Sequence, residues 1–269
     1  MSNFPQNNTQ RFELKNDIVN CDIIGDVHGC YDELIELLKK LGHNDIINSN
    51  VKSNENPKLI FVGDLVDRGE KIVDTLMLVL RLCKLGYALC VLGNHDWKFY
   101  KWLLGRNVEV NHGLEESINE INLLDDEKRN ILINELIAFY ENAPLAVICN
   151  DNKLVVAHAA WHNELKSASP HEIRAYTMYG PITGNKTIDG YPERVDWAVG
   201  YKGPELVVFG HQVYKIPYVN SNSIGIDTGC VYGGYLTALK YPTLEVVQIK
   251  SNYARYKSKR LEDSVLEAR

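Results

Sequence analysis

Three stretches in the first hundred residues share one arrangement: a short apolar run ends at a turn that combines glycine with acidic, amide or imidazole side chains. The turns are residues 25–29 (GDVHG), 63–69 (GDLVDRG) and 93–96 (GNHD). An apolar run bounded in this way predicts a buried strand. Because ligand sites in open α/β sheets lie beyond the carboxyl ends of the strands, we expect the three turns to converge.

The second half of the chain indicates a further sheet. Helices are expected over 31–41 and 71–85, and over most of 97–140 with a break near 111–113. After Pro144, short apolar runs predict a second, mixed or antiparallel sheet. The expected strands are 18–24, 59–62, 87–92, 146–149, 153–158, 206–209, 224–226, 236–239 and 244–249. Residues 166–204 are interpreted as a long polar loop, of the kind that is functional or disordered.

A chain of 269 residues can hold one large α/β domain or two small ones. We expect a polar, frayed lead-in over 1–17, a single domain over 18–250 and a charged tail over 251–269. The net charge of −6 and the lack of an extended basic region argue against a long nucleic acid as partner. No apolar run reaches membrane length and no signal-peptide pattern is present, so a cytoplasmic protein without a membrane partner is expected.

Cysteine use excludes one kind of metal site. None of the six cysteines forms a C-x-x-C pair, which excludes a zinc ribbon or dithiol motif. Four of them lie in apolar segments, where a reduced thiol behaves as a small hydrophobic side chain. Cys30 and Cys230 flank polar turns near the candidate site, but the sequence does not indicate catalysis by either.

Histidines and oxygen donors gather at the ends of the expected strands. His28, His95, His158 and His211 each follow an apolar run, and the turns at 25–29, 63–69 and 93–96 add carboxylates and an amide. A single histidine is more often structural, and Asp-Arg-Gly is also ordinary turn chemistry. The combination, however, suits divalent ions such as Mn²⁺, Fe²⁺ or Zn²⁺.

Two such ions about 3.5–4 Å apart would clamp a phosphate and lower the pKa of a bridging water to give hydroxide. Asp64 is the natural bridging carboxylate, since its two oxygens can each bind a cation. His95 would then be available to protonate the leaving oxygen. Arg68 suits a phosphate, because guanidinium binds phosphate oxygens in pairs.

The motifs GDVHG, GDLVDRG and GNHD, followed by AH at 157–158 and GH at 210–211, resemble those of the calcineurin-like metallophosphoesterases, in the branch that contains the PPP-type phosphatases. The resemblance implies an α/β fold of two packed mixed β-sheets flanked by helices, the metallophosphoesterase β-sandwich. It implies two divalent metal ions, with Mn²⁺ expected and Fe²⁺, Zn²⁺ or Co²⁺ as alternatives.

The resemblance also implies roles for individual residues. One ion would be held by Asp26, His28 and Asp64, and the other by Asp64, Asn94, His158 and His211. His95 matches the general acid, Asp67 its supporting carboxylate and Arg68 a phosphate clamp.

Three positions depart from the protein-phosphatase pattern. Cys30 stands in place of glutamine, and Asp96 in place of glutamate. No histidine lies two residues after His211, so we expect the first ion to lack a ligand from that motif.

Later motifs resemble two bacterial groups. Residues 179–184, 196–203 and 226–239 look like the stand-alone hydrolases that cleave diadenosine tetraphosphate asymmetrically, and like the phosphatase module of polynucleotide kinase-phosphatase. The absence of kinase and ligase parts favours the first. A dinucleoside tetraphosphate is therefore the expected substrate, hydrolysed asymmetrically. The alternatives are a phosphoserine/threonine protein, an RNA-end phosphate, or an inactive phosphate-binding module.

Four further residues are candidates for contact with the substrate. Arg174 and Arg194 could reach a phosphate, with a surface salt bridge as the alternative. Tyr179 could stack on a base, although aromatic residues are more often packing residues. Asp227 could support a ligand of the site, or could simply shape its turn.

Overall fold

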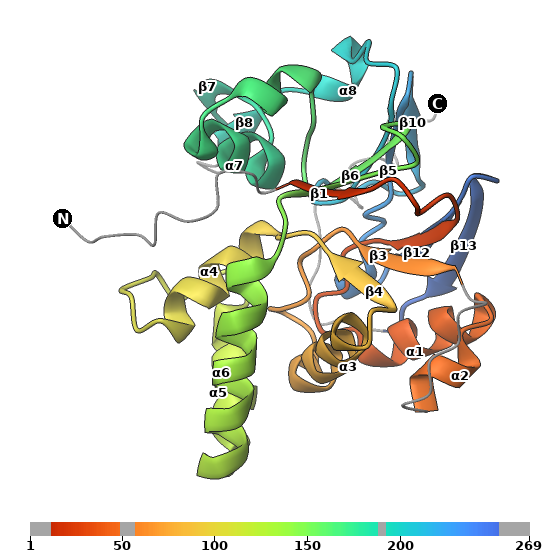
Figure 1. Cartoon of the computed structure of the whole chain (residues 1–269). Helices are drawn as coiled ribbons and strands as arrows, with labels where there is room; N and C mark the ends of the chain where they lie inside the picture. Colours follow the sequence, from red (N-terminus) through yellow and green to blue (C-terminus); the bar gives the residue numbers. More distant parts are fainter. Residues whose placement is uncertain (1–11, 49–56, 188–191, 253–269) are drawn as a thin grey trace.

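The computed structural model describes residues 12–48, 57–187 and 192–252, and in it two β-sheets pack face to face (Figure 1). The five-stranded sheet has the order β13-β12-β2-β3-β4. Its strands are β2 (Cys21–Ile24), β3 (Lys58–Phe61), β4 (Ala88–Cys90), β12 (Tyr235–Tyr241) and β13 (Glu245–Lys250). Strands β2, β3 and β4 are parallel, so their carboxyl ends lie at one edge, whereas β12 is antiparallel to β2.

The six-stranded sheet has the order β1-β5-β6-β9-β11-β10. Its strands are β1 (Phe12–Lys15), β5 (Ala146–Cys149), β6 (Leu154–Ala157), β9 (Leu206–Phe209), β10 (Tyr218–Asn220) and β11 (Ser223–Gly225). Strands β6 and β9 are parallel neighbours. Side chains such as Ile23 and Ile60 from one sheet join Val156 and Val208 from the other in a buried core between the sheets.

Helices cover both outer faces of the sandwich. Beneath the five-stranded sheet lie α1 (Tyr31–Lys40), α2 (Asn44–Asn48) and α3 (Ile72–Lys84) (Figure 1). Helix α1 forms because Leu34, Leu37 and Leu38 recur at helical spacing and are all fully buried. The following helices are α4 (Asn94–Leu103), α5 (Leu114–Leu123) and α6 (Asp126–Asn142). The other face carries η1 (Asn163–Ser167), α7 (Pro170–Tyr179) and α8 (Trp197–Gly200).

The structure confirms the predicted fold class and the three strand–turn–helix units, but corrects three expectations. Residues 12–15, expected within a frayed lead-in, form β1 and pair with β5. Residues 166–204 are not one long loop, because they contain α7, α8 and a hairpin of β7 (Ile182–Lys186) and β8 (Pro192–Arg194). Strands β12 and β13, expected in the second sheet, join the first.

The tail expected from residue 251 is described only for Ser251 and Asn252, which contact Glu33. Residues 1–11 of the lead-in and 253–269 of the tail lie outside the described residues. Among the helices of the described ranges, none has the length and apolar character that crossing a membrane requires.

Candidate active site

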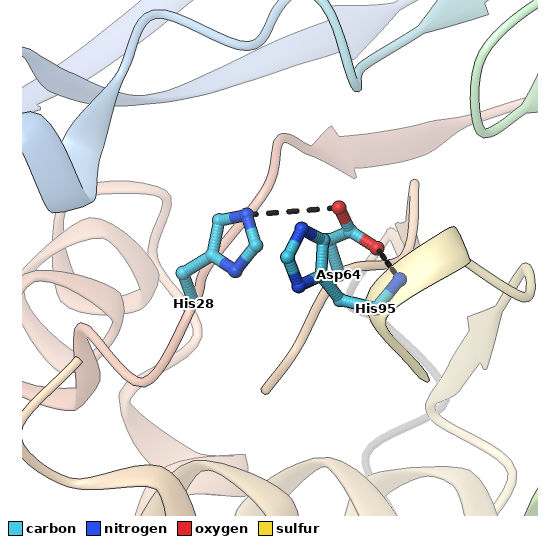
Figure 2. A group of neighbouring side chains, drawn as sticks. All are labelled: His28, Asp64 and His95. Atoms are coloured by element: carbon cyan, nitrogen blue, oxygen red, sulfur yellow. Dashed lines mark hydrogen bonds and ion pairs between the residues drawn. The ribbon is translucent and has the colours of Figure 1, made fainter. Parts of the chain in front are cut away.

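The turns after β2, β3 and β4 meet those after β6 and β9 at one edge of the sandwich. Ligand atoms of His28, Asp64 and His95 all lie within 4.8 Å of one another, as do those of Asp64, His158 and His211. Figure 2 shows the first of these groups, with His28 and His95 approaching Asp64 from different turns. The predicted convergence of the strand ends is confirmed.

Unusual backbone geometry marks these turns. His28, Asp64, Asp67, Arg68 and His211 all have positive φ angles, from 44° to 73°. Non-glycine residues rarely adopt this conformation, and it persists only where the surroundings impose it. Strain of this kind gathers at functional sites, and here five predicted site residues carry it.

His28 is oriented by the backbone. Its Nδ1 donates to the carbonyl oxygen of Val66 at 2.6 Å, which leaves the lone pair of Nε2 pointing into the site, 3.6 Å from Asp64 Oδ2. Burial, helped by the charge of Arg68, holds the pKa of His28 well below its ordinary value. The imidazole is therefore neutral, as a metal ligand must be.

His158 is held in the same way on the other side of Asp64. Its Nδ1 donates to Val62 O at 2.9 Å, so Nε2 faces inward with a lone pair. That atom lies 3.1 Å from Asn94 Oδ1 and 3.4 Å from Asp64 Oδ2. Burial lowers the pKa of His158 to about 4, which keeps the imidazole neutral. Three acceptor atoms thus face one another, an arrangement that a cation between them would stabilise.

Asp26 lies beside these groups but belongs to neither. Its two carboxylate oxygens accept from the amide of His211 at 3.1 and 3.0 Å. A side chain at Gly210 would collide with the Asp26 carboxylate, so the close approach requires glycine there. Burial, followed by the charges of Asp227 and Asp64, raises the pKa of Asp26. Asp26 remains a predicted ligand, and the carboxylates of Asp227 and Asp64 are near enough to affect its pKa.

Asp96 is not turned toward the metal groups. Its Oδ2 accepts from the amides of Asp64 at 2.7 Å and Gly93 at 3.2 Å, and its Oδ1 accepts from the amide of Leu65 at 3.1 Å. The hydroxyl of Tyr140 donates to Oδ1 as well. Asp96 therefore holds the turn that carries Asp64, a role that the GNHD motif alone did not reveal.

His95 and Asp67 form the pair expected of an acid and its supporting carboxylate. His95 Nδ1 donates to Asp67 Oδ2 at 2.6 Å, and both side chains are buried. The other oxygen of Asp67 accepts from Ser117 Oγ at 2.6 Å. Sequence reasoning missed Ser117, because no motif marks this serine within the stretch expected to be helical. Burial raises the pKa of Asp67 to about 7, against which the Ser117 hydrogen bond acts.

Arg68 bridges two histidines of the site. Its two terminal nitrogens donate to the Nε2 atoms of His28 and His95, each at 2.8 Å. The guanidinium also lies 5.5 Å from the ring centre of Tyr232. A guanidinium that reaches both histidines can also reach a phosphate bound between them.

Electrostatic interactions link three of the remaining candidate residues to the site: Arg194 to His158, Tyr179 to Asp64 and Asp227 to Asp26. Arg194 donates to the carbonyl oxygen of Tyr179, and its charge helps lower the pKa of His158. Burial raises the pKa of Tyr179, and the charge of Asp64 adds to the effect. Arg174 lies over the ring of Trp97, 4.8 Å from its centre. The charge of Asp227 helps raise the pKa of Asp26, and its Oδ1 accepts from the amide of Gly229.

These donors fit divalent cations. Two histidines present neutral Nε2 atoms that backbone carbonyls have fixed, and carboxylate and amide oxygens complete an N/O set without thiolate. Asp64 belongs to both groups, so donors lie on either side of one shared carboxylate.

Comparison with known proteins gives the family. The sequence pattern of the calcineurin-like phosphoesterase family matches residues 20–215, and this chain belongs to that family. The expectation of a metal-dependent phosphoesterase is confirmed.

Similar proteins extend over most of the chain. A bis(5'-nucleosyl)-tetraphosphatase PrpE [asymmetrical] from Anoxybacillus flavithermus is 44% identical, covering 86% of this chain and 94% of that protein. The protein of the same name from Halalkalibacterium halodurans is 42% identical, covering 86% and 93%. The crystal structure of a candidate diadenosine tetraphosphatase has a TM-score of 0.63 at 24% identity, covering 89% of this chain and 97% of that one, which supports the fold.

Proposed function

We propose that this protein hydrolyses dinucleoside tetraphosphates asymmetrically, releasing ATP and AMP from diadenosine tetraphosphate. The observation that carries a phosphoesterase function is the convergence of His28, His158 and Asn94 on Asp64, beside the His95–Asp67 pair. The substrate class rests on relatives that carry this name and match along nearly their whole length.

We assign Asp26, His28 and Asp64 to one divalent ion, and Asp64, Asn94, His158 and His211 to the other. When bound, such ions would withdraw charge from the phosphate oxygens and lower the pKa of the attacking water. We propose Mn²⁺ as the ion, with Fe²⁺, Zn²⁺ and Co²⁺ also compatible with the N/O donors.

The protein's own groups would then act on the substrate in the following way. With substrate bound, Arg68 would donate to the phosphate oxygens instead of to His95 Nε2, which frees that nitrogen to carry a proton beside the phosphate and to give it to the leaving oxygen. Asp67 keeps the imidazole oriented through the 2.6 Å bond to Nδ1. Arg194 donates to the carbonyl oxygen of Tyr179, and we assign the distal phosphates and a base to these two residues and to Arg174.

We place this activity in the cytoplasm. All six cysteines are free in the structure, the state that a reducing compartment maintains. The proposed partner is a small phosphorylated substrate.

Hydrolysis of p-nitrophenyl phosphate with Mn²⁺ tests the reaction class. Asp64→Ala should abolish it, whereas Asp74→Ala, which removes an exposed carboxylate from α3, should not. Product analysis tests the substrate. ATP plus AMP from diadenosine tetraphosphate supports the proposal, and turnover of only a phosphopeptide or an RNA 3′-phosphate rejects it.

A further inference from the structure

Ser117 makes two hydrogen bonds to one residue fifty positions away. Its Oγ donates to Asp67 Oδ1 at 2.6 Å and accepts from the Asp67 amide at 3.0 Å. Ser117 lies on α5 and is completely buried, as is Asp67. The hydroxyl is therefore used fully by the backbone and side chain of Asp67, without competition from water.

These bonds fix the carboxylate that orients His95. Asp67 has one oxygen on Ser117 Oγ and the other on His95 Nδ1, both at 2.6 Å. A carboxylate held at both oxygens cannot rotate about its terminal bond. Without the hydroxyl, Oδ1 would be a buried acceptor lacking that donor, and the carboxylate could turn away from His95.

Two more groups, one on α5 and one just before it, bind backbone amides of residues 67–73. The carbonyl of Gly113 accepts from the Arg68 amide at 3.2 Å. The carboxylate of Glu120 accepts from the amides of Ile72 and Val73 at 2.9 and 2.8 Å, and so caps α3. With Ser117 between them, these groups recur at helical spacing and hold residues 67–73 along one side of α5.

We propose that Ser117 is a positioning residue that locks the Asp67 carboxylate so that His95 keeps its proton aimed at the leaving oxygen. This inference rests on the proposed function. A purely structural role, in which Ser117 only satisfies the buried amide of Asp67, predicts a general loss of stability instead.

The leaving group of the substrate separates the two roles. Phenyl phosphate needs a proton on its leaving oxygen, whereas 2,4-dinitrophenyl phosphate releases a stable anion. Ser117→Ala should lower kcat on phenyl phosphate about tenfold, part of what a general acid contributes, and leave the dinitrophenyl ester within about twofold. Alanine is a good helix former, so α5 should persist, and thermal melting checks this. If Ser117→Ala reduces the folded fraction, Ser117→Cys replaces it in the test. Its thiol is a weaker donor of similar shape, so it should also lower kcat on phenyl phosphate more than on the dinitrophenyl ester.

A double-mutant cycle tests whether the effect passes through His95. In a His95→Ala background, Ser117→Ala should cause no further loss of kcat on phenyl phosphate, because the group it positions is gone. Ser223→Ala is the matched control, since that buried serine on β11 donates to Asn220 O. It should leave both esters unaffected.

Equal losses on both esters, or a full additional loss in the His95→Ala background, would overturn the role of Ser117. Failure of the proposed function looks different. In that case the wild type would not hydrolyse the esters, or His95→Ala itself would show no dependence on the leaving group.

Discussion

The backbone amide of Asp64 donates to Asp96 Oδ2 at 2.7 Å, so one carboxylate fixes the position from which another reaches the metal groups. Asp64 needs this support because its φ of 51° is unfavourable for a residue with a side chain. The same Asp96 carboxylate also receives the amides of Leu65 and Gly93.

Asp96→Ala should therefore unfold more readily and bind metal more weakly. It leaves three buried amides without this acceptor, which should cost about 3 kcal/mol of unfolding free energy. Chemical denaturation measures the loss, and calorimetric titration with Mn²⁺ measures the affinity. Asp96→Asn keeps one acceptor oxygen, so its stability and Mn²⁺ affinity should lie between those of the wild type and of Asp96→Ala. Stability equal to that of the wild type would contradict the supporting role of Asp96.

Two glycines should be essential for metal binding without being needed for their backbone angles. A side chain on Gly93 would collide with Asp64 Oδ1, and one on Gly210 with Asp26 Oδ1. Gly93→Ala and Gly210→Ala should each weaken Mn²⁺ binding at least about tenfold by displacing a carboxylate. Gly200→Ala is the matched control, because a Cβ there meets nothing within 4 Å. Unchanged Mn²⁺ affinity in Gly210→Ala would argue against Asp26 as a ligand.

The stability of the metal-free protein should fall between pH 6.5 and 8. Burial raises the pKa of Asp64 to about 8 and of Asp67 and Asp96 to about 7, from an ordinary value of 3.8. In this window the folded state binds more protons than the unfolded state, so raising the pH disfavours folding. The lowered pKa of His158 has the opposite effect, but only between about 4 and its ordinary value of 6.5.

Thermal melting in a chelator tests this pH dependence. The melting temperature should decline through the window, and saturating Mn²⁺ should raise it and flatten the decline, because a cation favours the ionised carboxylates. A melting temperature that stays constant in chelator from pH 6.5 to 8 would show that these carboxyls are ionised throughout.

How far sequence reasoning reached depended on the distance over which each interaction acts. The turns that carry Asp26, Asp64 and Asn94 could be predicted to converge because each follows an apolar run within a few residues, and strand ends of a parallel sheet meet. Ser117 could not, because only the packing of α5 against the 63–69 turn brings it to Asp67. The sheet of β12 was likewise unpredictable, since its pairing with β2 spans most of the chain.

Helix α7 is a different case, because its signal was local and was missed. Ser169 accepts from the amide of Glu172, whose side chain accepts from the amide of Ser169, and Pro170 occupies the first turn. This capping box with an N-terminal proline is readable in the sequence. Only Ile173, Thr177 and Met178 of this helix are buried. Its other residues are largely polar, and this polar composition suggested a loop.

Arg194 should distinguish the dinucleotide from small esters. It ends β8 of the exposed hairpin and donates to Tyr179 O, and its charge helps lower the pKa of His158. Arg194→Ala should raise KM for diadenosine tetraphosphate about tenfold, the loss expected for one hydrogen bond to a charged phosphate, with kcat nearly unchanged. KM for p-nitrophenyl phosphate, which has no distal phosphates, should change by less than about twofold.

Two variants separate contact from general charge. Lys186→Ala removes a positive charge from β7 of the same hairpin and should leave KM unchanged, because exposed charges away from the substrate are screened by salt. Arg194→Lys keeps the charge but loses the paired donors, and should recover only part of the affinity. If Lys186→Ala raised KM as much as Arg194→Ala, the hairpin would attract the substrate by its charge alone. If Arg194→Ala raised KM equally for diadenosine tetraphosphate and p-nitrophenyl phosphate, the arginine would act on the metal groups through His158 rather than on the distal phosphates.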